Sequence, residues 1–197
     1  MKFPTMNHMP VPAWCFPAPT LVLATSLALL TTVSVEAVEG YKNYKFGFSP
    51  QQVKRLCPVS LQQIDNEGWS DAYGHDCVVL MAADFPFLDT EREVNFVFTP
   101  DGLVTVAFVL EFSEFAPVAK TLREKYGDGQ LQPNPKEYMQ MAARFDAGQP
   151  HSVIKITFDE DTVVLVGTRD GEGEATIVLL YNDPDAVSSV TPNASDL

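Results

Sequence analysis

The sequence has few of the residues on which most catalytic and metal sites depend. Its 197 residues include three histidines and three cysteines. It contains no G-x-S-x-G turn, no H-E-x-x-H pair and no glycine-rich phosphate loop. These absences favour a protein that is not an enzyme and that holds no metal and no cofactor.

Basic residues are also scarce. Lys and Arg number 13 against 26 Asp and Glu, which gives a formal net charge of -13. Affinity for phosphate backbones and anionic lipid headgroups comes mainly from Lys and Arg. We therefore expect the protein to bind neither nucleic acid nor a membrane surface.

Charged residues are absent from one N-terminal stretch, residues 20–33, which read TLVLATSLALLTTV. The small-residue pattern Val35-Glu36-Ala37 follows, and this combination is typical of a signal peptide. We predict a signal peptide at residues 1–37, cleavage near Ala37 and a periplasmic or secreted mature protein. Retention as a membrane anchor is the alternative. A spanning helix needs about 20 apolar residues, so we expect no stable anchor.

Cys57 and Cys77 are the two cysteines downstream of this segment. Outside the cytosol, two cysteines in one small domain usually oxidise to each other if their Cα atoms lie within about 7 Å. We therefore predict a Cys57–Cys77 disulfide that closes the loop between them. In the alternative, Cys77 is a free thiolate with His75 as its base, in a small hydrolase or thiol enzyme.

The order of predicted elements is helix, strands, helix, strands. It indicates an α+β domain with an antiparallel meander sheet and two helices packed on one face. Both halves follow a helix-then-meander pattern, so two copies of one unit are an option. We place a single domain at 38–181 and a disordered tail at 182–197. The predicted helices are 49–56 and 113–126, and the predicted strands are 77–82, 93–99, 103–111, 138–146, 151–158, 161–168 and 174–181.

Large apolar side chains in two loops are the candidates for an interaction surface, because aromatic residues are the usual anchors of interfaces. In the alternative, these aromatics fold back and cover the sheet. The candidate residues are Trp69, Tyr73, Phe85, Phe87 and Leu88.

One acidic turn copies part of a calcium loop. Asp170, Glu172 and Glu174 have the spacing of the first three ligands, but Tyr181 stands where the last ligand, an acid, should be. A calcium-binding or small-ligand-binding protein is therefore a further alternative.

Three segments resemble a known family. They are Gly47-Phe48-Ser49-Pro50-Gln51-Gln52-Val53, then Leu56-Cys57-Pro58, and later Phe98-Thr99-Pro100-Asp101-Gly102-Leu103. Over residues 44–111 this pattern resembles the SmpA/OmlA envelope proteins, which share a fold with the β-lactamase inhibitory proteins. The resemblance implies a non-catalytic protein-binding or assembly module. We therefore expect an exported monomer whose partner is another envelope protein.

Overall fold

The computed structural model describes residues 38–187, and these form an α+β domain, as predicted. Its main element is an eight-stranded antiparallel sheet, and a small two-stranded sheet lies at its N-terminal end. The small sheet contains β1 (Gly40–Tyr41) and β2 (Tyr44–Lys45). The main sheet contains β3 (Gln62–Ile64), β4 (Val78–Phe87), β5 (Thr90–Thr99), β6 (Gly102–Leu110), β7 (Gln130–Gln132), β8 (Val153–Phe158), β9 (Val163–Arg169) and β10 (Ala175–Asn182). The helices are α1 (Pro50–Leu56), α2 (Ser70–Tyr73), η1 (Phe112–Glu114), α3 (Phe115–Tyr126), α4 (Pro135–Asp146) and α5 (Pro184–Val187).

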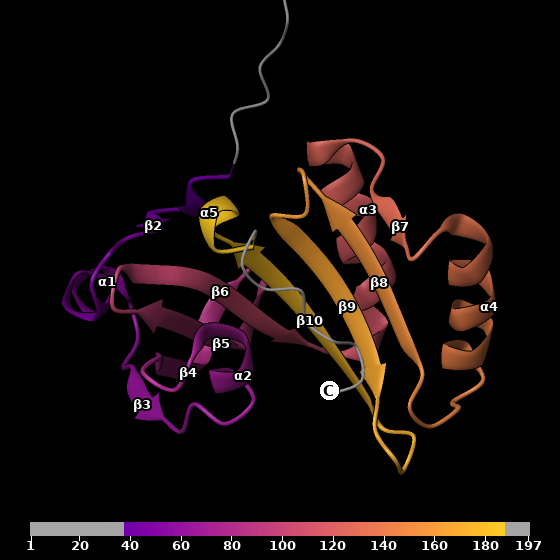
Figure 1. Cartoon of the computed structure of the whole chain (residues 1–197), viewed down its shortest axis with the longest axis horizontal. Helices are drawn as coiled ribbons and strands as arrows, with labels where there is room; N and C mark the ends of the chain where they lie inside the picture. The colour runs from indigo at the N-terminus through magenta and orange to yellow at the C-terminus, as the bar shows by residue number, and fades with distance from the viewer. Residues whose placement is uncertain (1–37, 188–197) are drawn as a thin grey trace, which may run out of the picture. The chain divides into compact units, whose positions relative to one another are not determined.

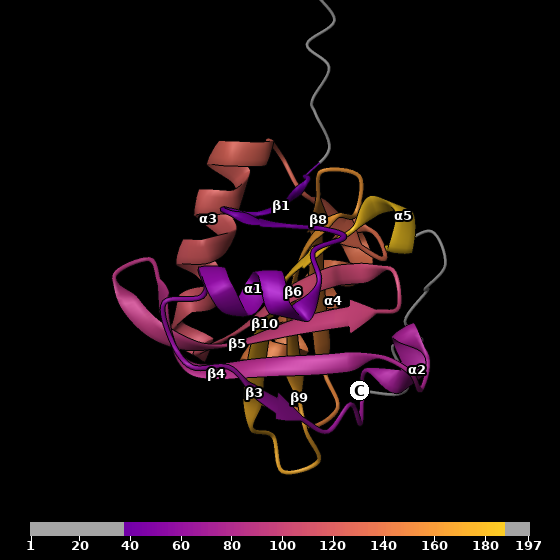
Figure 2. The same ribbon diagram turned by 90° about the vertical axis from the view of Figure 1, so that its left-hand side faces the viewer.

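The order of strands in the main sheet is symmetric. It runs β3-β4-β5-β6-β10-β9-β8-β7 (Figures 1 and 2), so each end has a short edge strand followed by a three-stranded meander. One half contains α1 and β3 to β6, and the other contains α3, α4 and β7 to β10. The halves meet where β6 pairs with β10, and this arrangement gives the two helix-plus-meander units suggested by the sequence.

Helix α1 forms for the local reasons that the sequence indicates. Ser49 Oγ accepts a hydrogen bond from the Gln52 amide at 3.4 Å, and the Ser49 amide donates to Gln52 Oε1 at 2.8 Å. Pro50 occupies the first helical position, which has no need of a free N–H. Val53 then points into the core, fully buried.

Helix α4 corrects the sequence prediction, which made 138–146 a strand. Asn134 Oδ1 accepts a hydrogen bond from the Glu137 amide at 3.0 Å, and Pro135 follows the cap. At helical spacing after the cap, Tyr138 and Met141 pack against the core and Phe145 is part of it. An N-cap, a proline at the first position, a helical stripe and a composition rich in Ala, Met, Glu, Gln, Lys and Arg all favour the helix.

The two faces of the sheet are covered differently. The main core lies on one face and receives Val53 from α1, Leu122 from α3 and Phe145 from α4. Figure 1 shows α3 behind β8 and β9, so the opposite side of these strands faces the viewer. On that opposite side a smaller cluster of Cys77, Val79, Val97 and Val104 lies beneath α2.

The end of the chain departs from the prediction of a tail that starts at residue 182. Strand β10 continues through Asn182, whose amide donates to the Thr162 carbonyl at 2.7 Å. Helix α5 follows directly. The predicted signal peptide at 1–37 and the remainder of the predicted tail, 188–197, lie outside the described residues.

Candidate functional site

Both cysteines are free thiols in the structure, and the predicted disulfide between them stays a prediction. Cys57 packs against the main core, whereas Cys77 belongs to the cluster beneath α2. Within the loop between them, Asn66 holds the C-terminal part in place. Its Nδ2 donates to the carbonyls of His75 at 2.9 Å and of Cys77 at 3.0 Å.

The pairing of Cys77 with His75 does not form a reactive site. Cys77 is 5% exposed, and burial raises the pKa of its thiol. The protonated thiol is a poor nucleophile at neutral pH. His75 is exposed, and among the described residues no hydrogen bond joins its ring to Cys77. The geometry therefore gives the thiol-enzyme alternative no support.

The predicted aromatic surface separates into three environments. Trp69 and Tyr73 stack at 6.3 Å and cover the smaller cluster, which is the alternative that the sequence left open. Phe85 and Phe87 are 3% and 4% exposed and lie in the main core, so their assignment to a surface was wrong. Leu88 is 66% exposed in the turn that follows.

A β-bulge explains the burial of the two phenylalanines. The pairing of β4 with β5 shifts by one residue between Ala82 and Phe85. Strict alternation from Ala82, a core residue, would turn Asp84 and Pro86 inward. The extra residue reverses this alternation, so Phe85 and Phe87 face the core instead.

The side of the sheet away from α1, α3 and α4 offers the more open surface, which we call the open face. Its strand register aligns side chains from neighbouring strands in rows. The first row contains Met81, Asn95, Ala107, Leu180, Val164 and Thr157. The second contains Val109, Val178, Val166 and Lys155.

Aliphatic side chains on the open face remain half-buried. Val109, Val166, Val178 and Leu180 all retain accessible surface, although they lie on the central strands. In the described part of the chain, the helical side chains that pack on this side are Trp69, Tyr73 and Ala186, which contact the cluster of Cys77 and its neighbours. The centre of the face therefore keeps accessible aliphatic surface at these four residues.

Two buried polar atoms in the first row have no hydrogen-bond partner among residues 38–187. They are Asn95 Oδ1 and Thr157 Oγ1. Their residues are 6% and 1% exposed. The Asn95 amide nitrogen is used, since it donates to Glu93 Oε1 at 3.1 Å. Unpaired buried polar atoms cost roughly 1–3 kcal/mol each.

In a neighbouring row on the same face, the polar side chains form hydrogen bonds with one another. Tyr73 Oη and Thr105 Oγ1 are 2.6 Å apart, and Thr105 Oγ1 donates to Asn182 Oδ1 at 3.0 Å. Burial raises the pKa of Tyr73 despite its hydrogen bond with Thr105. The row beneath α2 is therefore satisfied within the chain, whereas Asn95 and Thr157 are not.

The acidic turn does not hold a calcium ligand set. Asp170 Oδ1 accepts the amides of Glu172 and Glu174, both at 2.9 Å, and so closes the turn itself. Within residues 38–187, no three His, Cys, Asp or Glu side chains are placed to hold a metal ion. No helix in the same range is long and apolar enough to cross a membrane.

The residues of the open face are not among the surface residues predicted from the sequence. A signal for it exists in β10, where Ile177, Leu179 and Tyr181 face the core while Val178 and Leu180 face the other way. A strand that is apolar on both sides predicts contacts on both sides. In the described residues, helices of the main core cover one side of this strand, which leaves the other available.

Comparisons with known proteins place the chain in a family. The comparison with curated proteins and the comparison with solved structures give no match. A family model with the description "Uncharacterised protein" matches residues 41–195, a range that includes both halves of the main sheet. The chain therefore belongs to this family of uncharacterised proteins.

Proposed function

We propose that the protein is an exported, non-catalytic, monomeric module that binds another envelope protein through the open face. The observation that carries the proposal is the group of aliphatic side chains that keep accessible surface on the central strands of that face. They are Val109, Val166, Val178 and Leu180. The resemblance to SmpA/OmlA proteins over 44–111 points to the same class of function.

The chemistry of the face defines the partner. Val109, Val166 and Val178 are stiff, β-branched side chains, so little rotamer freedom is lost when they are covered. A net charge of -13 favours a partner whose contact surface has a basic rim. We infer a protein surface with an aliphatic centre and surrounding Lys or Arg.

The test places a positive charge at the centre of the face. In the exported protein, p-benzoylphenylalanine at position 178 should form a photo-crosslink to one protein of the native envelope. Val178→Lys should weaken binding of that protein by about tenfold or more, or roughly 1.4 kcal/mol. Leu88→Lys is the matched control, because Leu88 is 66% exposed but lies in a turn outside the face. Its affinity should equal that of the unaltered protein.

Three outcomes would overturn the proposal. Equal affinity of both lysine variants would place the interface elsewhere. A crosslink to a second copy of the chain, with a dimer in sedimentation, would make the face a homodimer interface. A crosslink within one chain that is lost when residues 188–197 are removed would make the chain's own C-terminal segment the occupant.

A further inference from the structure

Val38 is tied to a residue far along the chain. Its backbone N–H donates to Asp159 Oδ2 at 3.1 Å, across 121 sequence positions. The same carboxylate oxygen accepts a second hydrogen bond, from Thr162 Oγ1 at 2.9 Å. Thr162 is 2% exposed and also donates its hydroxyl to the Asp159 carbonyl at 2.6 Å. The carboxylate is therefore held in place before it meets Val38.

The turn that carries Asp159 has an unusual backbone. Asp159, Glu160 and Asp161 have φ values of 49°, 55° and 71°. Three consecutive non-glycine residues in the left-handed region are disfavoured. Such a conformation persists where surrounding contacts determine it, and the bonds of Asp159 to Thr162 and Val38 are contacts of this kind.

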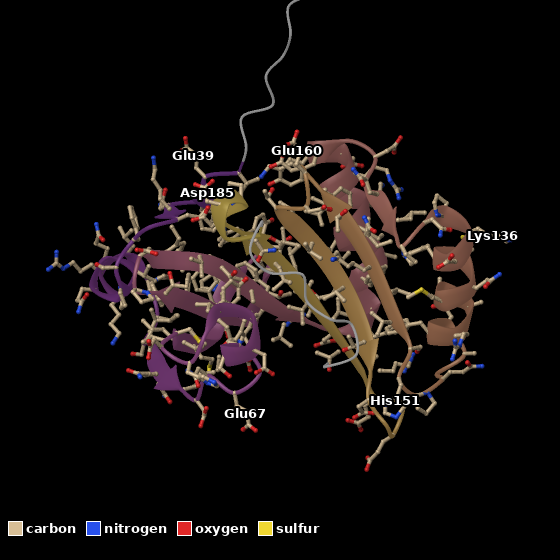
Figure 3. All side chains as sticks on the ribbon, viewed as in Figure 1. Glu39, Glu67, Lys136, His151, Glu160 and Asp185 are labelled. Atoms are coloured by element: carbon tan, nitrogen blue, oxygen red, sulfur yellow. The ribbon has the colours of Figure 1, made fainter. Side chains whose placement is uncertain are left out.

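The surroundings of Val38 are rich in negative charge. Val38 lines a shallow pocket of about 390 Å³ together with Glu39, Asp183 and Asp185. The basic residue in the pocket lining is Lys45, whose Nζ lies 3.4 Å from Glu39 Oε2. Figure 3 shows Glu39, Asp185 and Glu160 at the same end of the domain. A new positive charge on Val38 would therefore enter a region with excess negative charge.

We propose that cleavage between Ala37 and Val38 creates an α-ammonium group that forms an ion pair with Asp159. The inference rests on the export and cleavage proposed above. A signal peptidase would hydrolyse the Ala37–Val38 amide with one water, which leaves a carboxylate on Ala37 and an ammonium on Val38. The amide-to-carboxylate hydrogen bond thereby becomes a charge-assisted bond, which is stronger. Asp159 thus recognises the mature N-terminus, and processing stabilises the fold.

The sign of the pH dependence follows from the charges near the new amine. Asp159 accepts its hydrogen bond, and Glu39, Asp183 and Asp185 outnumber Lys45 around it. These groups favour the protonated amine, whose ordinary pKa is about 7.7–8.0. The pKa of the Val38 amine should therefore be raised. The added stability is fully present below the ordinary pKa and is lost as the pH rises through the raised value.

The test uses the full chain with residues 34–37 replaced by the factor Xa recognition sequence IEGR, so that cutting exposes Val38. At pH 6.5 the cut protein should melt about 2–4 °C above the same cut protein with an acetylated Val38 amine. The difference should vanish at pH 10. Asp159→Asn should abolish the gain, and Glu160→Gln, in the same turn, should retain it. Acetylation keeps the test valid if the Asp159 variant fails to fold.

Equal melting temperatures of the free and acetylated forms at pH 6.5, or a gain retained in Asp159→Asn, would overturn the ion pair. The intact mass of the exported protein tests the cleavage separately. A mature chain that starts at a residue other than Val38 would refute the processing site. Neither result depends on partner binding, which the crosslink at position 178 measures.

Discussion

Two threonines on the same side of the sheet have opposite hydrogen-bonding environments. Thr105 is fully buried and bonds to both Tyr73 and Asn182. Thr157 is 1% exposed, and its hydroxyl has no partner within the described residues. The same substitution should therefore have opposite effects on the stability of the free protein.

We expect Thr157→Val to leave the free energy of unfolding unchanged or to raise it by up to about 1 kcal/mol, because it removes an unpaired polar group of similar shape. Thr105→Val should lower it by roughly 1–3 kcal/mol, because Asn182 loses its partner. Urea unfolding measures both values. A strong loss of stability in Thr157→Val would mean that the hydroxyl is satisfied in solution.

Predictions for single residues in the aromatic loops differ in outcome. The sequence correctly raised the option that Trp69 and Tyr73 cover the sheet, because aromatics in a short loop often fold back. It failed for Phe85 and Phe87, because a bulge that reverses alternation leaves no clear mark in the sequence. The spacing of the two cysteines along the chain also does not reveal that Cys57 and Cys77 belong to different apolar clusters.

At the scale of elements, α1 and α4 begin with the same signal, but the sequence prediction gives a helix only for α1. Ser49-Pro50 and Asn134-Pro135 both place a capping side chain before a proline at the first helical position. The capping box of Ser49 with Gln52 predicts the start of α1. The prediction of a linker over Leu131 to Pro135 leaves the second cap out. Both the cap and the composition of α4, rich in Ala, Met, Glu and Gln, favour a helix.

The cap of α4 gives a prediction at this scale. Asn134→Ala should lower the free energy of unfolding by about 1 kcal/mol, because the Glu137 amide loses its acceptor. Asn134→Asp should retain most of the stability, because a carboxylate also caps and favours the helix N-terminus. Thermal unfolding of both variants provides the measurement. Equal losses in the two variants would indicate that the cap is not the cause.

At the scale of the whole molecule, the symmetric strand order makes each half incomplete. Strand β6 is central and almost fully buried, and its hydrogen bonds on one side all go to β10. The cross-strand pairs Val106–Tyr181 and Phe108–Leu179 connect the core of one half to the core of the other. Separation of the halves would convert β6 into a long apolar edge strand, which is a template for pairing with another chain.

We therefore expect the isolated N-terminal half, residues 38–111, to associate through β6 instead of remaining a monomer. Because β6 meets β10 antiparallel, a second β6 can take the place of β10 about a two-fold axis. Sedimentation should show a dimer or a larger species. Ala107→Pro should abolish that association, because proline removes a ladder hydrogen bond in the middle of β6. A folded monomeric half with dispersed amide resonances would contradict this account and would make each unit a domain in its own right.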